Sequence, residues 1–467
     1  MAADNFNSTA DLTKNKGFPS TLTITSKDEV EKPYNPYEHR TVEHPNSTIG
    51  STIHLLKACL GTGILAMPAA YKSSGLVTGT IGTILAGLIC THTVQMLVKA
   101  SQELCVEAKK PSMTFAETCG AAFTYGPKPL RSWGNFIKVL TDYAMAVTYF
   151  SVCTVYIVFI ASSFKEVLDY YLPEYIISIQ MYCLFTLVPL ILICQIRNLK
   201  YLVPFMALAN LMIVAIFCIT LYYVFVDLPP ISERELVVEP VHWPKFLSIV
   251  IFAMEGVGVV MPVENEMKSP EKFLGCPGVW NVSMIIVVSL YAIVGFFGYV
   301  QFGDLAKGSI TLNLPEDEIM AQSAKLLMAV VIYFSYALQF YVPMELVSRL
   351  VRSSCCGKFE NLSQICTRTF LVTITVIIAV SFPNLEFVIG IAGAIFFSSL
   401  GFLFPAVVDL VYRWDKGLGP FNYVLWKDAL IIIISLVILV LGTYVSVLEM
   451  IESNSEAVSN ATKIDFS

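Results

Sequence analysis

Two short stretches combine glycines with a Met-Pro pair inside long apolar runs. Residues 61–68 read GTGILAMP, and residues 255–262 read EGVGVVMP. Unwound backbone inside a membrane leaves N–H and C=O groups without helical partners, and it is tolerated only where these groups line a polar cavity. The N-terminal end of a half-helix can then bind a carboxylate, and the C-terminal end a cation. The stretches therefore predict a ligand site; glycines that serve only close helix packing are the alternative.

Seven residues of these stretches are candidates for contact with a ligand. They are Gly61, Thr62, Gly63 and Ile64 in the first stretch, and Glu255, Gly256 and Gly258 in the second. We expect the backbone N–H groups of the first stretch to receive a carboxylate and the glycines of the second to form the facing wall. The apolar neighbours of the breaks offer no fixed charge to a basic or acidic side chain, so the sequence predicts a ligand with a small, neutral side chain.

Two ionisable residues lie close to these stretches. His54 precedes Gly61 by seven residues, which places both on nearly the same face of a helix, about 10 Å apart along its axis. An ionisable group inside a span is costly and usually faces the interior of the bundle. His54 and Glu255 are therefore candidates for carrying a proton. A packed histidine and a carboxylate that only braces the break are the alternatives.

The elements that position these residues are membrane helices. The chain has 467 residues, of which 55% are hydrophobic and 14% charged, against about 25% charged in an average soluble protein. Its mean hydropathy of +0.67 predicts a polytopic, all-α membrane protein. We expect about eleven spans, at residues 50–70, 76–98, 139–164, 176–195, 201–226, 246–264, 279–302, 324–348, 367–383, 386–411 and 428–449.

The two glycine stretches fall in the first and the sixth of these spans. A separation of five spans is what two five-helix repeats would produce, and broken helices at matching positions of two repeats are typical of secondary transporters. We therefore predict a five-plus-five inverted repeat with broken helices 1 and 6, followed by an eleventh helix.

Charge in the loops gives the orientation. With the N-terminus in the cytosol, most of the 30 lysines and arginines fall in cytosolic segments, as the positive-inside rule requires. We expect a disordered cytosolic tail at 1–48, a transmembrane domain at 49–450 and an extracytosolic tail at 451–467. Asn460 is then an accessible glycosylation acceptor. None of the 12 cysteines lies in a clear outer loop, so we expect no structural disulfide.

The sequence argues against several other classes of protein. It has no metal-ligand spacing, nucleotide-binding loop or nucleophile constellation, so we expect neither an enzyme nor a bound cofactor. The basic residues are spread among loops, so no nucleic-acid partner is expected. The span count disfavours a seven-helix receptor.

Several motifs together resemble the amino acid/auxin permease superfamily, and most of all its proton-coupled amino acid transporters. They are IHLLKACLGTGILAMPAAYKSSGL from residue 53, THTVQMLVKASQELC from 91, FAMEGVGVVMPVENEM from 252 and SYALQFYVPMEL from 335. MTFAETCGAAFTYGP, from residue 113, is also similar. The resemblance covers about residues 48–450.

The resemblance implies symport of small neutral amino acids such as Ala, Gly and Pro with protons, across the plasma membrane or an endosomal or lysosomal membrane. It also implies that His54 corresponds to the family's first-span histidine, to which proton coupling is attributed. Two alternatives remain open. One is a sodium-coupled amino acid transporter of the same fold. The other is an amino-acid-sensing transceptor with little flux, which would engage a cytosolic signalling partner through its N-terminal tail.

Overall fold

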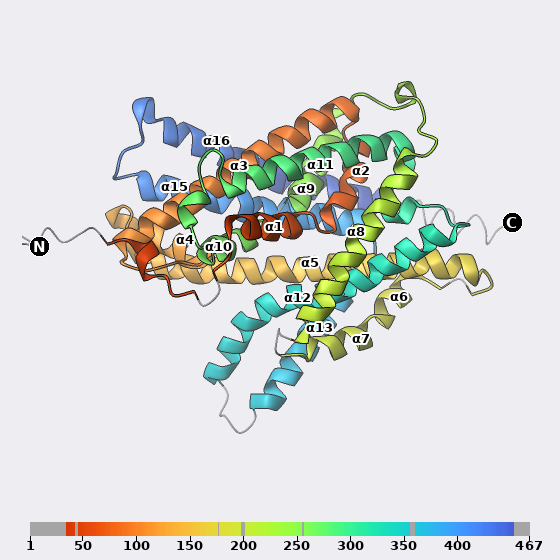
Figure 1. Cartoon of the computed structure of the whole chain (residues 1–467), viewed down its shortest axis with the longest axis horizontal. Coiled ribbons are helices and arrows are strands. Elements are labelled where there is room, and N and C mark those ends of the chain that lie inside the picture. The colour runs from red at the N-terminus through yellow and green to blue at the C-terminus, as the bar shows by residue number, and fades with distance from the viewer. Residues whose placement is uncertain are drawn as a thin grey trace, which may run out of the picture. The chain divides into compact units, whose positions relative to one another are not determined.

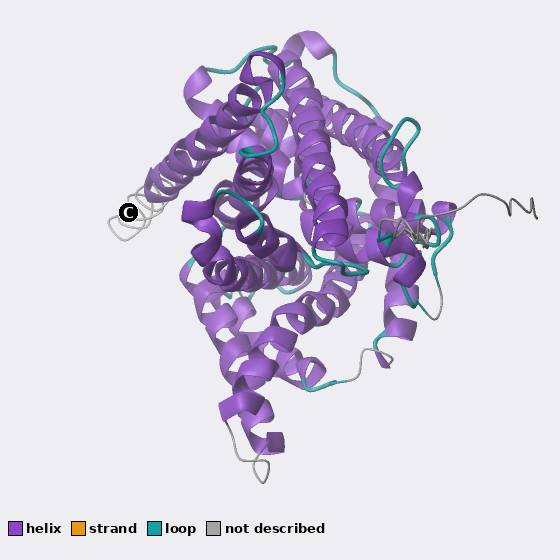
Figure 2. Cartoon of the chain, turned by 90° about the vertical axis from the view of Figure 1, so that its left-hand side faces the viewer, coloured by secondary structure: helices purple, strands orange, loops and turns teal. Residues whose placement is uncertain are grey.

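The computed structural model describes residues 34–42, 45–175, 177–197, 201–254, 256–354 and 360–452. Helices make up 81% of this part of the chain, and Figure 2 shows helices joined by loops, with no strand among the described residues. The residues are apolar over helix-length runs, and only a helix pairs all its backbone groups within one such run. The protein is therefore an all-α, multi-pass membrane protein, as predicted.

The helices follow one another along the chain as Figure 1 labels them. The first eight α-helices are α1 (Thr48–Cys59), α2 (Gly63–Lys72), α3 (Leu76–Glu107), α4 (Phe115–Thr124), α5 (Gly134–Tyr171), α6 (Ile179–Phe185), α7 (Leu187–Cys194) and α8 (Val203–Phe225). The next eight are α9 (Trp243–Ala253), α10 (Val257–Asn265), α11 (Val279–Phe302), α12 (Ile319–Ser354), α13 (Glu360–Ser381), α14 (Leu385–Ile391), α15 (Phe404–Arg413) and α16 (Tyr423–Val437).

Shorter helical segments complete the described chain. The 3₁₀ segments used below are η1 (Pro36–His39), η5 (Pro240–His242), η7 (Gly303–Leu305) and η8 (Ile310–Asn313). Two π-helical segments, η10 (Ala392–Phe397) and η11 (Ser399–Leu403), join α14 to α15, and a third, η13 (Ile438–Gly442), follows α16.

The helices agree in position with the predicted spans. In the described chain, nine are long and apolar enough to cross a membrane, and the bent pair Thr48–Cys59 and Gly63–Lys72 would make a tenth. The fourth predicted span coincides with the shorter apolar helix Ile179–Cys194. At about 1.5 Å per residue this helix is shorter than a hydrocarbon core of roughly 30 Å. The count of eleven and the inverted repeat therefore stay predictions.

The ninth and tenth predicted spans are separate helices in the structure. α13 ends at Ser381, and α14 begins at Leu385. Asn384 caps α14, because its side chain accepts a hydrogen bond of 3.1 Å from the N–H of Phe387. An Asn at this position satisfies one of the N–H groups that the first turn of a helix leaves unpaired.

Packing places the two broken spans against each other. α2 packs on α9 and α11, and α1 packs on α10 and α11. In Figure 1 the ribbon changes direction between α1 and α2, and α10 lies beside α1. The long helix α5 packs on α12 and α13 and on the short helix α4. The halves of the first span thus contact the halves of the sixth.

Candidate functional site

The first break lies between Cys59 and Gly63. The axes of α1 and α2 differ in direction by 49° across it. Thr62 occupies the N-cap position of α2 without a side-chain hydrogen bond to the helix. The first N–H groups of α2 therefore lack a side-chain cap and carry the positive end of the helix dipole. Proline does not make the break, because α2 continues through Pro68.

The second break lies between Ala253 and Val257. α9 ends with the N–H of Met254 bonded to the carbonyl of Val250 at 2.9 Å. Gly256 is the N-cap residue of α10 and makes no side-chain cap. The sixth span is therefore interrupted where the second glycine stretch predicts it. Glu255 lies outside the described residues, so its role in binding or in carrying a proton stays a prediction.

The two breaks are in direct contact. A Cβ atom added at Gly63 would lie 2.5 Å from the Cα of Ala253, and one added at Gly256 would lie 3.1 Å from the Sγ of Cys59. Real Cβ atoms essentially never come within 3.0 Å of another heavy atom in this way. Gly63 is therefore required by the close approach of the two spans.

A cavity of about 460 Å³ opens at the first break. This volume lies within the range of small-molecule sites, which are mostly apolar with a few placed polar groups. Gly61, Thr62 and Ile64 line it, together with apolar residues of α8, α11 and α12. Its other polar or charged groups include Lys57, Tyr156, Asn210 and Ser335. Three of the four site residues predicted in the first stretch thus share one cavity.

Gly256 and Gly258 lie apart from this cavity. Gly258 borders a space of about 20 Å³ beside Tyr149 and Gln339, and Gly256 borders one of about 10 Å³ beside Trp280. Spaces of this size hold about one water molecule. A Cβ at Gly258 would lie 2.2 Å from the Oη of Tyr149. Close packing therefore accounts for Gly258 in this conformation, and its role in binding stays a prediction.

His54 lies on an exposed part of α1. Lys57, one turn further along the same helix, is also exposed and lines the 460 Å³ cavity. Sequence reasoning missed Lys57, although its spacing of four residues from Gly61 is about one helical turn and places it one turn before the break. The expectation that the site offers no fixed charge rests on the apolar neighbours of the breaks alone, whereas the lining of the cavity also includes Lys57.

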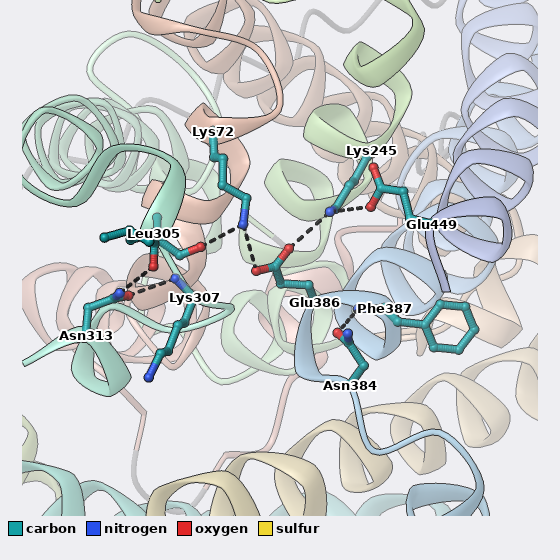
Figure 3. Close-up of polar contacts among 10 residues, drawn as sticks. Lys72, Lys245, Leu305, Lys307, Asn313, Asn384, Glu386, Phe387 and Glu449 are labelled. Carbon is teal, nitrogen blue, oxygen red and sulfur yellow. Dashed lines mark hydrogen bonds and ion pairs between the residues drawn. The ribbon is translucent and has the colours of Figure 1, made fainter. Parts of the chain in front are cut away.

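Four charged residues connect the broken helices at the end predicted to face away from the cytosol. Glu386, at the start of α14, lies 3.2 Å from the Nζ of Lys72 on α2 and 3.1 Å from the Nζ of Lys245 on α9. Lys245 also pairs with Glu449. Figure 3 shows both lysines pointing at the carboxylate of Glu386. We call Lys72, Lys245, Glu386 and Glu449 the outer clamp.

The outer clamp borders a second cavity, of about 470 Å³, which Glu235, His242 and Asp304 also line. The side chain of Lys245 is only 8% exposed, so its ammonium depends on the two carboxylates in place of water. Lys72 makes a further hydrogen bond of 2.9 Å to the carbonyl of Ala306. The clamp holds the outer halves of both broken spans to α14.

Comparison with known proteins identifies the family. The family model described as "Transmembrane amino acid transporter protein" matches residues 44–448. The chain belongs to this family of transmembrane amino acid transporters.

Two relatives of the transporter give more detail. The chain is 41% identical over 430 residues to the Drosophila melanogaster protein named "Proton-coupled amino acid transporter-like protein pathetic". That match covers 91% of this chain and 90% of the relative. The chain is also 24% identical over 387 residues to "Vacuolar amino acid transporter 4" of Saccharomyces cerevisiae, covering 76% of this chain and 51% of the relative. The transporter is accordingly not an enzyme.

At the other end of the transporter, an ion pair ties the chain before α1 to the sixth span. Arg40 donates to both carboxylate oxygens of Glu264 on α10 at 3.2 Å, to the carbonyl of Glu264 at 3.1 Å and to that of Pro111 at 2.8 Å. The two side chains are 6% and 2% exposed. We call the pair of Arg40 and Glu264 the inner latch.

The inner latch includes Arg40, which belongs to the tail predicted for residues 1–48. Residues 36–39 form the 3₁₀ segment η1, and the N–H of Asn46 bonds to the carbonyl of Glu266 at 2.8 Å. The stretch that we expected to be disordered therefore contains residues packed on the transmembrane domain before α1 begins at Thr48. The reason is the set of hydrogen bonds that Arg40 makes to Glu264 and Pro111, which composition alone does not reveal. Residues 1–33 and Asn460 lie outside the described residues.

Proposed function

We propose that this transporter carries small neutral amino acids such as Ala, Gly and Pro, in symport with protons. The observation that supports it best is the cavity at the first break, where the uncapped N-terminus of α2 and Lys57 can attract a carboxylate. The largely apolar remainder of the lining suits a small apolar side chain. The name of the Drosophila relative supports protons as the coupling ion.

The proposed cycle uses the two breaks and the two ends of the broken spans. The α-carboxylate of the amino acid binds N–H groups near Gly61 and Thr62, and its side chain faces the apolar wall. The outer clamp closes the entrance from the outer side while the 460 Å³ cavity extends from the break along α1 to Ile53 and Lys57. The described conformation is then one that faces the cytosol.

The membrane and the tail partner belong to the same proposal. We place the transporter in the plasma membrane or an endosomal or lysosomal membrane, with a cytosolic N-terminus; the vacuolar yeast relative supports an internal membrane. The second candidate function is the transceptor, which the inner latch favours because it connects the chain before α1 to α10. In that case the inner latch would transmit the binding of an amino acid to the N-terminal tail, and the tail would engage a cytosolic signalling partner.

Uptake of radiolabelled alanine into cells that express the protein, with external pH and sodium varied separately, tests the proposal. We expect uptake that rises as external pH falls and does not depend on sodium. Sodium-dependent uptake would favour the sodium-coupled alternative, and binding with little flux would favour the transceptor. Competition by glycine and proline is expected to exceed that by arginine or glutamate. Stronger competition by glutamate would assign Lys57 to side-chain recognition.

A further inference from the structure

Tyr291, on α11, reaches both helix breaks with one hydroxyl group. Its Oη lies 2.8 Å from the carbonyl oxygen of Ala253, the last residue of α9. It also hydrogen-bonds to the carbonyl oxygen of Cys59, the last residue of α1. The Tyr291 side chain is fully buried. The C-terminal ends of two half-helices thus converge on a single atom.

These carbonyl groups have a distinct chemistry. The last carbonyls of a helix lack intrahelical partners and carry the negative end of the helix dipole. In transporters built from broken helices, unwound carbonyls and half-helix C-terminal ends are the groups that coordinate sodium. Two such oxygens that converge within hydrogen-bond distance of one point are the kind of groups from which a cation site is built. In this protein that point holds a hydroxyl.

We propose that the Tyr291 hydroxyl takes the place of a coupling sodium ion and thereby makes transport independent of sodium. The phenolic proton supplies the positive partner that the two carbonyls require, although one hydroxyl can donate to only one of them at a time. The side chain belongs to the protein, so it fills the position throughout the transport cycle. The inference rests on the proposed function. It takes proton-coupled transport of amino acids as given and explains why sodium is not the coupling ion.

Tyr291→Phe is the variant that tests the inference. It keeps the ring that fills the buried position and removes only the hydroxyl. The matched control is Tyr299→Phe, because Tyr299 is also buried on α11, about two turns further along. The full-length proteins are reconstituted in liposomes, and alanine uptake driven by a pH gradient is measured in sodium, lithium or choline salts.

We expect the wild type and Tyr299→Phe to transport equally in the three salts. Tyr291→Phe should lose about tenfold in uptake in choline, because the hydroxyl that donates to one or the other of these buried carbonyls is removed, and sodium should restore part of it. Uptake by Tyr291→Phe that equals the wild type in every salt would overturn the inference. A loss of the same size in every salt would also overturn it, because Tyr291 would then only brace the breaks.

A second measurement does not depend on the folding of the variant. The melting temperature of the purified wild type is compared in sodium and choline salts, since an ion that binds the folded state raises it. We expect no difference, and a clear stabilisation by sodium would overturn the inference. If the wild type takes up no alanine in any salt, the proposed function is contradicted. The melting comparison would still test whether the folded protein binds sodium, because it does not require transport.

Discussion

Gly61 and Gly63 are two residues apart, and their surroundings differ. A Cβ at Gly61 would have its nearest neighbour, the carbonyl oxygen of Ala58, at 3.8 Å, whereas a Cβ at Gly63 would lie 2.5 Å from the Cα of Ala253. The sequence pattern treats the two glycines alike. In the structure Gly61 lines the cavity, whereas Gly63 allows the two broken spans to come into contact.

This difference predicts opposite outcomes for two alanine substitutions. Gly63→Ala should lower the melting temperature and abolish alanine uptake, because backbone of α9 must move to make room. A cost of about 1–3 kcal/mol is typical of overpacking. Gly61→Ala should melt like the wild type and reach the membrane in the same amount. Equal melting temperatures for both variants would show that the contact between the breaks is looser than described.

His54 gives a prediction about coupling. Proton coupling needs a group whose charge changes during the transport cycle, and His54 is the candidate on α1. We expect alanine-evoked inward current to grow as external pH falls from about 7.5 to about 5.5, and His54→Ala to lose that current while still exchanging substrate. Electrophysiology on protein at the cell surface measures both. Full pH-dependent current in His54→Ala would leave Glu255 as the next residue to test.

At the level of elements, charge secures the first broken span at its outer end and the sixth broken span at both ends. The outer clamp ties α2 and α9 to α14, and the inner latch ties α10 to the chain before α1. Alternating access in such folds requires one set of half-helices to move against the rest of the bundle. We therefore predict that the clamp and the latch form and break during transport.

Glu386→Gln should loosen the outer clamp. The amide cannot balance the charges of Lys72 and Lys245, so the closed outer end loses stability. We expect a cysteine introduced by Ser73→Cys, which lines the clamp cavity, to react about tenfold faster with a membrane-impermeant thiol reagent. This corresponds to about 1.4 kcal/mol.

The control for this experiment is Glu166→Gln, which breaks the pair of 2.7 Å with Lys307. The Lys307 side chain is 44% exposed, and exposed pairs contribute about 0–1 kcal/mol, so labelling should change little. If Glu386→Gln is labelled no faster than this control, the clamp does not close the entrance.

Arg40→Ala should destabilise the transporter, because Glu264 stays buried with its charge unbalanced. Removing one partner of a buried pair costs about 3–5 kcal/mol, although Gln102 still donates to Glu264 at 3.0 Å and reduces the loss. Thermal unfolding in detergent is the measurement. Arg40→Lys keeps the charge but loses the guanidinium bonds to the carbonyls of Glu264 and Pro111, so its melting temperature should lie between those of the wild type and Arg40→Ala. An unchanged melting temperature for Arg40→Ala would show that the latch does not stabilise the fold.

At the scale of the whole molecule, the sequence was most informative where a pattern is repeated along the chain. Long apolar runs predicted the positions of the spans, and the paired glycine stretches predicted both breaks. Composition did not predict whether Pro68 breaks the first span. In the structure α2 begins at Gly63 and continues through Pro68. Pro68 is the sixth residue of α2, so its missing N–H costs the helix one bond, to the carbonyl of Ile64, without ending it.

The contacts between distant segments could not be predicted. Nothing near Glu386 in the sequence indicates the lysines that it joins, and Tyr291 resembles any other tyrosine of a span. Their roles depend on which helices pack together, and a single sequence does not contain that information. The spacing of Lys57 from Gly61 was a usable signal, because four residues are about one helical turn and place Lys57 one turn before the break.

The central claim is that this chain alone carries amino acids uphill by means of a proton gradient. The most direct test is uptake of radiolabelled alanine by liposomes that contain only the purified protein, with an acidic outside and no sodium. We expect alanine to accumulate above the external concentration, and this accumulation to collapse when a protonophore removes the gradient. Alanine that only equilibrates across the membrane, or that accumulates only when sodium is added, would contradict it.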